Sequence, residues 1–106
     1  MNQIILTPSQ TLVLSDGASG VSVTVHFADW LPSGQLAPGN QLTAIASASE
    51  TVVCAAPVDS NARRLIKSLS ITNASGASVT FTLGIKSGSV YAVRVATLAD
   101  DATYSF

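Results

Sequence analysis

Apolar and small polar residues alternate strictly along residues 79–85. The apolar positions are Val79, Phe81, Leu83 and Ile85, and Thr80 and Thr82 lie between them. A period of two puts one set of side chains on each face of an extended strand, so this segment predicts a half-buried β-strand. Similar patterns predict further strands at residues 11–14, 21–27, 41–48, 51–55, 63–72, 90–96 and 103–106. No segment shows a convincing helical period.

Clusters of turn-forming residues separate these strands. The clusters at 15–20 and 73–78 are rich in Gly, Ser, Asn and Asp, so each is expected to close a hairpin, and 86–89 predicts a third turn. The first two expected hairpins are 11–14 with 21–27 and 63–72 with 79–85. About eight short strands, spaced by roughly 8–12 residues, predict an all-β fold. The predicted architecture is a two-sheet antiparallel β-sandwich, jelly-roll-like or immunoglobulin-like.

The alternation stops between residues 28 and 40. That segment holds Trp30 together with two prolines and two glycines, and it shows no periodicity. It therefore predicts a long irregular connection, a feature that often has a functional role. Trp30 and Leu31 in this connection are candidate anchors for a partner protein. The alternative is that Trp30 covers one end of the sandwich.

The strand predicted at 63–72 has an unusual residue on its apolar face. With a period of two, Lys67 shares a face with Leu65, Leu69 and Ile71. A lysine in that position predicts that this end of the strand lies near a sheet edge or that the side chain reaches out to water.

Composition indicates one domain, residues 1–106, with an unusually neutral surface. Apolar residues make up 47% of the 106 residues and charged residues only 10%, well below the usual ~25%. The polar remainder is mainly Ser, Thr, Asn and Gln, whose side chains cost less to desolvate than ions. Such a surface suits burial against neighbouring subunits. A thin sandwich with Thr-rich outer faces explains the same composition.

The few charges are unevenly placed. The net charge is −1, and residues 1–53 carry acidic groups but no Lys or Arg, whereas all five cations follow. The two halves could meet head-to-tail between copies, although chance explains so small a bias better. No basic patch is present, so nucleic-acid binding is not expected. No signal peptide and no apolar run of ~20 residues are recognisable, so synthesis in a cytoplasm without membrane insertion is expected.

Residues capable of chemistry are scarce. His26 is the one imidazole, and Asp29 follows three residues later, so a Ser-His-Asp arrangement stays open beside the stronger reading of a surface histidine. Cys54 has no partner for an intrachain disulfide, and its strand context predicts a buried, inert side chain. No catalytic residue, metal site or cofactor is predicted, and the chain is not expected to be an enzyme. A glycosylation sequon at Asn73 is expected to be accidental.

Several segments follow a recognisable order along the chain: a strand ending near Ala-Pro, an Arg-rich strand ending in Asn, a Ser/Thr-Val hairpin, and a strand closing on Thr-Leu. The segments concerned are 38–43, 51–57, 61–73, 75–83, Tyr91 and 93–98. In this order they resemble small structural proteins encoded in the virion gene blocks of tailed bacteriophages. The resemblance spans roughly residues 20–100, and alternating Val and Thr occurs in many β proteins.

The resemblance implies a virion component, either a capsid decoration (cement) protein or a part of the neck, tail or fibre. The partners would be other virion proteins, capsid or tail subunits, and copies of the chain itself, with a trimer among the options. Similar chains continue beyond the Thr-Leu strand, whereas this one ends at Phe106. The closing strand is therefore expected to be shortened or to be completed by a partner.

Six residues are candidate interface residues. Arginine offers bidentate hydrogen bonds to carboxylates, and an aromatic terminal strand invites pairing with a neighbouring chain. The candidates are Trp30, Leu31, Arg63, Arg64, Tyr104 and Phe106. The alternative function is a carbohydrate- or receptor-binding β-sandwich module, which would need a row of exposed aromatic side chains from an aromatic content of only 6%.

Overall fold

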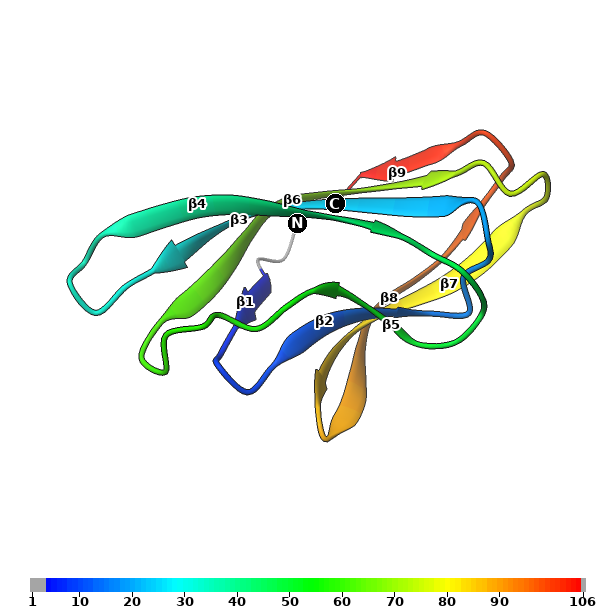
Figure 1. The fold of residues 1–106 in the computed structure, drawn as a ribbon. Helices are drawn as coiled ribbons and strands as arrows, with labels where there is room; N and C mark the ends of the chain where they lie inside the picture. The colour runs from blue at the N-terminus through cyan, green and yellow to red at the C-terminus, as the bar shows by residue number, and fades with distance from the viewer. Residues whose placement is uncertain (1–3, 106) are drawn as a thin grey trace.

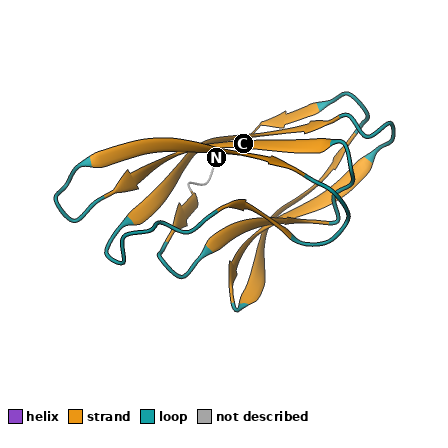
Figure 2. Cartoon of the chain, in the orientation of Figure 1, coloured by secondary structure: helices purple, strands orange, loops and turns teal. Residues whose placement is uncertain are grey.

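The computed structural model describes residues 4–105, which form nine strands and no helix (Figures 1 and 2). The strands are β1 (Ile4–Leu6), β2 (Thr11–Ser15), β3 (Val21–Trp30), β4 (Leu36–Ala44), β5 (Thr51–Cys54), β6 (Arg63–Asn73), β7 (Val79–Ser87), β8 (Ser89–Leu98) and β9 (Thr103–Ser105). They make two antiparallel sheets packed face to face, which confirms the all-β sandwich. The jelly-roll connectivity stays a prediction. Within residues 4–105 no helix of the length and apolarity needed to cross a membrane is found.

The two sheets have unequal sizes. The five-stranded sheet has the order β1-β6-β3-β4, with β9 also paired to β6, and the four-stranded sheet has the order β5-β2-β7-β8. Because β3 occupies one whole edge of β6, β1 and β9 share the other edge, at opposite ends. In Figure 1 the five-stranded sheet is the upper layer, and the β3–β4 hairpin projects beyond the lower layer at the left.

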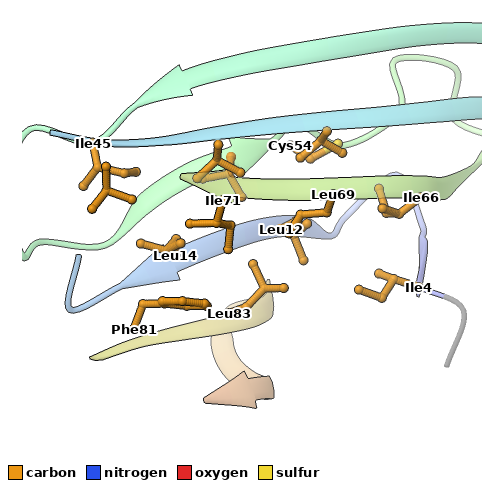
Figure 3. Packing of buried hydrophobic residues seen from close by; sticks show 14 of the residues in the cluster. Ile4, Leu12, Leu14, Ile45, Cys54, Ile66, Leu69, Ile71, Phe81 and Leu83 are labelled. Carbon is orange, nitrogen blue, oxygen red and sulfur yellow. The ribbon is translucent and has the colours of Figure 1, made fainter. Parts of the chain in front are cut away.

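The core lies between the inner faces of the two sheets (Figure 3). The strictly alternating strand β7 buries Val79, Phe81 and Leu83 while Thr80 is exposed, as its sequence predicts. These side chains pack with Leu12 and Leu14 of β2 and with Val23, Val25, Leu69 and Ile71 of the facing sheet. Burying one such large apolar side chain contributes about 1.5–3 kcal/mol, so this layer is the main source of stability.

Two of the three expected hairpins are wrong. β7 and β8 do form a hairpin, but β2 and β3 lie in different sheets, and so do β6 and β7. Their turn residues carry the chain from one layer to the other. Alternation cannot distinguish these cases, because a strand buries the same face whether its neighbour in sequence lies beside it or across the core.

The long irregular connection expected at 28–40 is also wrong. β3 continues to Trp30 and β4 begins at Leu36, so only residues 31–35 form a turn. Pro38 is tolerated because β4 is an edge strand, where a missing N–H can face away from the sheet. Gly39 is opposite Phe27, and a Cβ atom there would lie 2.8 Å from the Phe27 ring, so the ring occupies the space that glycine leaves.

A β-bulge explains the lysine on the apolar face of β6. His26 of β3 is paired with Ser68, whereas its neighbour Phe27 is paired with Ile66, so Lys67 is an extra residue. The extra residue reverses which side chains point inward, and Lys67 is exposed. The buried residues of β6 are Arg64 and Ile66 before the bulge and Leu69, Ile71 and Asn73 after it. The expected face shared by Leu65 and Leu69 is therefore wrong.

Asn73 links the β6–β7 connection to the β8–β9 connection, at the end of the sandwich opposite the β3–β4 turn. Its side-chain amide is fully buried and donates to the carbonyl oxygens of Ala77 at 2.8 Å, Leu98 at 2.9 Å and Ala99 at 3.3 Å. Its Oδ1 accepts from the backbone N–H of Ser75 at 3.0 Å. The side chain that the sequon singles out is thus engaged inside the fold.

Substitution of Asn73 by alanine is expected to lower the free energy of unfolding by about 2–4 kcal/mol, because buried carbonyl groups lose their donor. Asn61→Ala, in an exposed loop, is the matched control and is expected to change it by less than about 0.5 kcal/mol. Urea unfolding of both variants measures the difference. Equal effects would show that the Asn73 amide does not hold these connections together.

Candidate functional site

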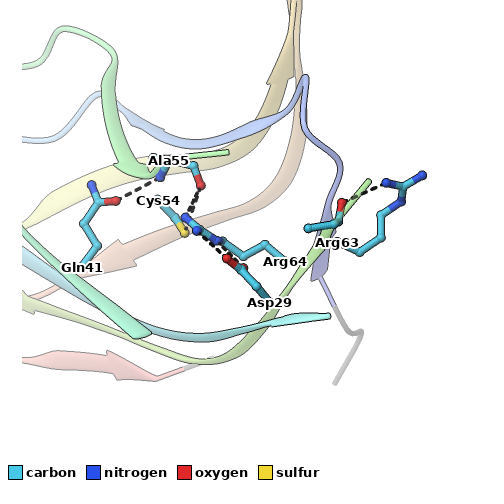
Figure 4. A network of polar contacts seen from close by, with 7 residues as sticks. Asp29, Gln41, Cys54, Ala55, Arg63 and Arg64 are labelled. Atoms are coloured by element: carbon cyan, nitrogen blue, oxygen red, sulfur yellow. Dashed lines mark hydrogen bonds and ion pairs between the residues drawn. The ribbon is translucent and has the colours of Figure 1, made fainter. Parts of the chain in front are cut away.

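The most polar buried cluster joins β3, β6 and the residue that follows β5 (Figure 4). Asp29 and Arg64 lie opposite each other on paired strands. The guanidinium donates from Nε to Oδ1 at 2.7 Å and from Nη2 to Oδ2 at 2.8 Å, which is a bidentate ion pair. The side chains are only 9% and 16% exposed, so the pair is shielded from water.

The rest of the Arg64 guanidinium is engaged as well. Nη1 donates to the carbonyl oxygen of Ala55 at 2.8 Å, and the group lies over the Phe27 ring, 3.8 Å from its centroid. The N–H of Ala55 in turn donates to Oε1 of Gln41 at 3.0 Å. We call the group Phe27, Asp29, Ala55 and Arg64 the inter-sheet clamp, since it fastens the end of β5 to the five-stranded sheet.

The clamp behaves as a closed structural element. The hydrogen bond that Arg64 donates to Asp29 is the main reason why the pKa of Arg64 is raised above its ordinary value, and burial acts in the opposite direction. Because every guanidinium nitrogen has an acceptor inside the chain and the side chain is only 9% exposed, this arginine is not presented to a partner's carboxylate.

Cys54 lies beside the clamp and is fully buried, as its strand context predicts. Its Sγ donates weakly to the Ala55 carbonyl oxygen at 3.7 Å. Burial raises the pKa of the thiol above its ordinary value of 9.0, and the nearby Arg64 guanidinium opposes that rise only in part. The thiol is therefore protonated at neutral pH, the form that is a poor nucleophile and a poor metal ligand.

The structure does not bring His26 and Asp29 together. His26 is exposed on the outer face of β3, whereas Asp29 points to the inner face and is held by Arg64. Successive residues of a strand alternate between the two faces of the sheet, so side chains three residues apart lie on opposite faces. Within residues 4–105 no three His, Cys, Asp or Glu side chains are grouped as metal ligands would be.

The candidate interface residues have different environments. Trp30 is 57% exposed at the end of β3, not on a loop, and Leu31 is partly buried in the turn. Arg63 is exposed, and its Nη1 donates to the carbonyl of the preceding residue, pointing away from the clamp. Arg64 is a correction, because its side chain stabilises the fold from inside and is not presented to a neighbour.

The terminal aromatic strand also differs from expectation. Tyr104 is half-buried and bridges the sheets, with its ring edge-on to Phe81 at 5.7 Å between centroids. Its hydroxyl accepts from Nε of Arg94 in β8 at 2.7 Å. Tyr104 thus closes the side of the sandwich between β8 and β9. Phe106 lies outside the described residues.

An apolar surface that the sequence did not reveal lies on the outer face of the five-stranded sheet. Trp30 is paired with Leu36, the buried Ala28 is paired with Pro38 and with Leu65, and Leu65 is paired with Ile5. Residues paired directly across strands share a face, so these apolar side chains are neighbours. We call Ile5, Trp30, Leu36, Pro38 and Leu65 the hairpin patch. Trp30 and Leu36 are 57% and 58% exposed.

The patch was missed because its members look unrelated in sequence. Leu36 and Pro38 lay in the expected irregular connection, and no strand was expected at Ile5. The one available signal was the run of residues 30–49, which contains no charged side chain. Comparisons with protein-family models, with curated protein sequences and with solved structures found no match.

Replacing Arg64 by methionine is expected to lower the free energy of unfolding by about 3 kcal/mol, because Asp29 keeps a shielded charge without a partner. Arg63→Met, one residue away and exposed, is the control and should cost less than about 0.5 kcal/mol. Chemical denaturation measures both values. The double variant Asp29→Leu with Arg64→Met should recover part of the loss, and failure to do so would contradict the charge explanation.

The buried Cys54 thiol is expected to make the free energy of unfolding depend on pH under alkaline conditions. Well below pH 9.0, the ordinary pKa of a thiol, Cys54 is protonated in the folded and unfolded chain alike, so it adds no pH dependence there. Above that value the unfolded chain releases the proton while the folded chain retains it, and the free energy of unfolding falls.

Between about pH 8 and about pH 10 the wild-type protein is expected to lose up to about 1 kcal/mol more than Cys54→Ala. Denaturation curves of both proteins at the two pH values give the comparison. Parallel pH profiles would show that burial does not perturb this thiol.

Proposed function

We propose that this chain is a structural subunit that acts by binding other protein subunits, as a virion component of a tailed bacteriophage. The proposed role is that of a capsid decoration or cement protein, or of a part of the neck, tail or fibre. The observation that carries the assembly role is the hairpin patch, an exposed apolar surface that includes the tip of the projecting β3–β4 hairpin.

An exposed apolar patch of this kind favours protein contact on physical grounds. Trp30 and Leu36 each leave more than half of their surface in water, and burial of apolar area is the main favourable term in association. Tryptophan is also enriched among the residues that dominate binding energy at interfaces. The residues of the patch lie in hydrogen-bonded strands, so little backbone ordering entropy is expected to be lost on binding.

The remaining outer face of the five-stranded sheet carries mainly hydroxyl groups, with Arg63 and Lys67 as its exposed cations on β6. Its paired positions include Ser22, Thr24, Ser68, Ser70, Thr72, Thr103 and Ser105. Covering such a face costs less desolvation energy than covering ions. Many weak contacts of this sort add up when a symmetric particle presents many equivalent copies.

The bacteriophage part of the proposal rests on the sequence resemblance alone, mainly at residues 51–98. The carbohydrate-binding alternative would need aromatic side chains in a row. Among residues 4–105 the exposed aromatic side chains are Trp30 in the five-stranded sheet and Tyr91 in the four-stranded sheet, so they form no row. The structure therefore offers no observation that favours this alternative.

Purified particles produced by the genome that encodes this chain are expected to contain it, as detected by mass spectrometry. Trp30→Ala is expected to lower the copies per particle about tenfold, because a central aromatic contact is worth more than 1.4 kcal/mol. Its thermal midpoint should shift by less than about 2 °C, since Trp30 is exposed.

Tyr91→Ala is the matched control, since Tyr91 is 75% exposed but lies away from the patch. It should leave incorporation unchanged. Particles without the chain would overturn the virion assignment. Equal losses of incorporation and of thermal stability in Trp30→Ala would show that Trp30 serves the fold and not a contact.

A further inference from the structure

We propose that two copies of this chain pair edge to edge through β4, antiparallel and centred on Leu42. The pairing would join their five-stranded sheets into one continuous sheet. This inference rests on the proposed function, because it names the contact through which a self-assembling subunit meets its own copy. It uses the backbone edge of β4, which is separate from the side chains of the hairpin patch around Trp30.

The edge of β4 is open and its hydrogen-bonding direction is fixed. Among the described strands β4 pairs with β3 alone. The N–H of Ile45 donates to the Val21 carbonyl at 2.8 Å, and at the turn the N–H of Leu31 donates to the Gln35 carbonyl at 2.9 Å. Odd-numbered residues of β4 therefore bond to β3, and even-numbered residues point their N–H and C=O groups away from the sheet.

Proline sets the register of a pairing at this edge. The even-numbered residues that can donate outward in succession are Asn40, Leu42 and Ala44, because Pro38 has no N–H. A two-fold axis at Leu42 places Leu42 opposite Leu42 of the second copy and Asn40 opposite its Ala44. Every outward N–H and C=O of these three residues then has a partner. An axis at Asn40 would instead put Pro38 opposite Leu42 and leave a carbonyl without a donor.

The side chains and charges along β4 favour a second copy of this chain as the partner of its open edge. Leu42 is 72% exposed, and at the axis it would pack against its own copy on the outer face. Residues 30–49 carry no charge, so two such edges meet without repulsion. Natural proteins protect open edges with lysines or prolines, and here Pro38 protects only the first half of β4. The β8 edge differs, because it carries Arg94, which would approach its like charge in a symmetric pair.

The contact is expected to be weak in solution and additive in an assembly. A strand pair of this length is smaller than the ~800 Å² per partner of a standard interface. Sedimentation analysis should therefore show a monomer of 10.8 kDa that converts to a dimer as the concentration rises. Repetition through particle symmetry would supply the remaining strength.

The test uses the complete chain and two substitutions at Leu42. Leu42→Lys places like charges at the axis, and Leu42→Pro removes only an N–H that points away from β3. Both should weaken dimerisation at least about tenfold. Circular dichroism should stay unchanged, because neither substitution affects the ladder with β3. Val58→Lys, at an exposed loop position, is the control that adds the same charge elsewhere and should leave the dimer intact.

Disulfide trapping in a Cys54→Ala background tests the register. Leu42→Cys is expected to cross-link two copies, since the paired Cα atoms would lie about 5.5 Å apart. Asn40→Cys alone should not cross-link, because the two Asn40 positions would be offset by four residues, about 13 Å. A mixture of Asn40→Cys with Ala44→Cys should cross-link.

Three results would overturn the inference. They are a monomer at every concentration, a dimer that both Leu42 variants leave unchanged, and cross-linking of Asn40→Cys with itself. A monomer that still enters particles would refute the β4 pairing and keep the proposed function. A β4 dimer that is absent from particles would support the pairing and refute the virion role.

Discussion

The packing of the two sheets against each other is the constraint on which the rest of the molecule depends. Leu14, Phe81 and Leu83 from one sheet meet Leu69 and Ile71 from the other, and no helix among residues 4–105 covers any face. A sandwich of this kind has only one buried layer, so each strand must keep its apolar residues on one side throughout. The two outer faces and the sheet edges are then left for water or for other proteins.

Two local features, a β-bulge and the inter-sheet clamp, adapt the strands to that single buried layer. The bulge at Lys67 lets β6 bury residues on both sides of a change of register, at the cost of one unpaired backbone position. Beyond the apolar layer, the clamp takes over as the contact between the sheets. The bidentate bond between Arg64 and Asp29, together with the Arg64 bond to Ala55, ties the end of β5 to the five-stranded sheet.

The same architecture determines which side chains and backbone groups are exposed on the surface. Because the charged residues are few and Asp29 is paired with Arg64 inside, the outer face of the projecting β3–β4 hairpin carries no Lys, Arg, Asp or Glu, and its tip is apolar. The hairpin patch and the open edge share strand β4, yet the patch offers apolar side chains and the edge offers backbone groups. The two surfaces are therefore distinct in chemistry although one hairpin carries part of both.

The all-β class and most of the strands followed from the sequence, because the alternation in a segment such as 79–85 depends only on local geometry and on one buried face. Strand β1 and the first half of β4 did not follow from it. Cys54 was correctly placed in the interior for the same reason. The partners of β2 and β6, the ion pair of Arg64 and the neighbours of Trp30 were decided by tertiary structure alone. These contacts join residues far apart in the chain. A two-residue period is satisfied equally when the next strand forms a hairpin in the same sheet and when it lies in the other sheet.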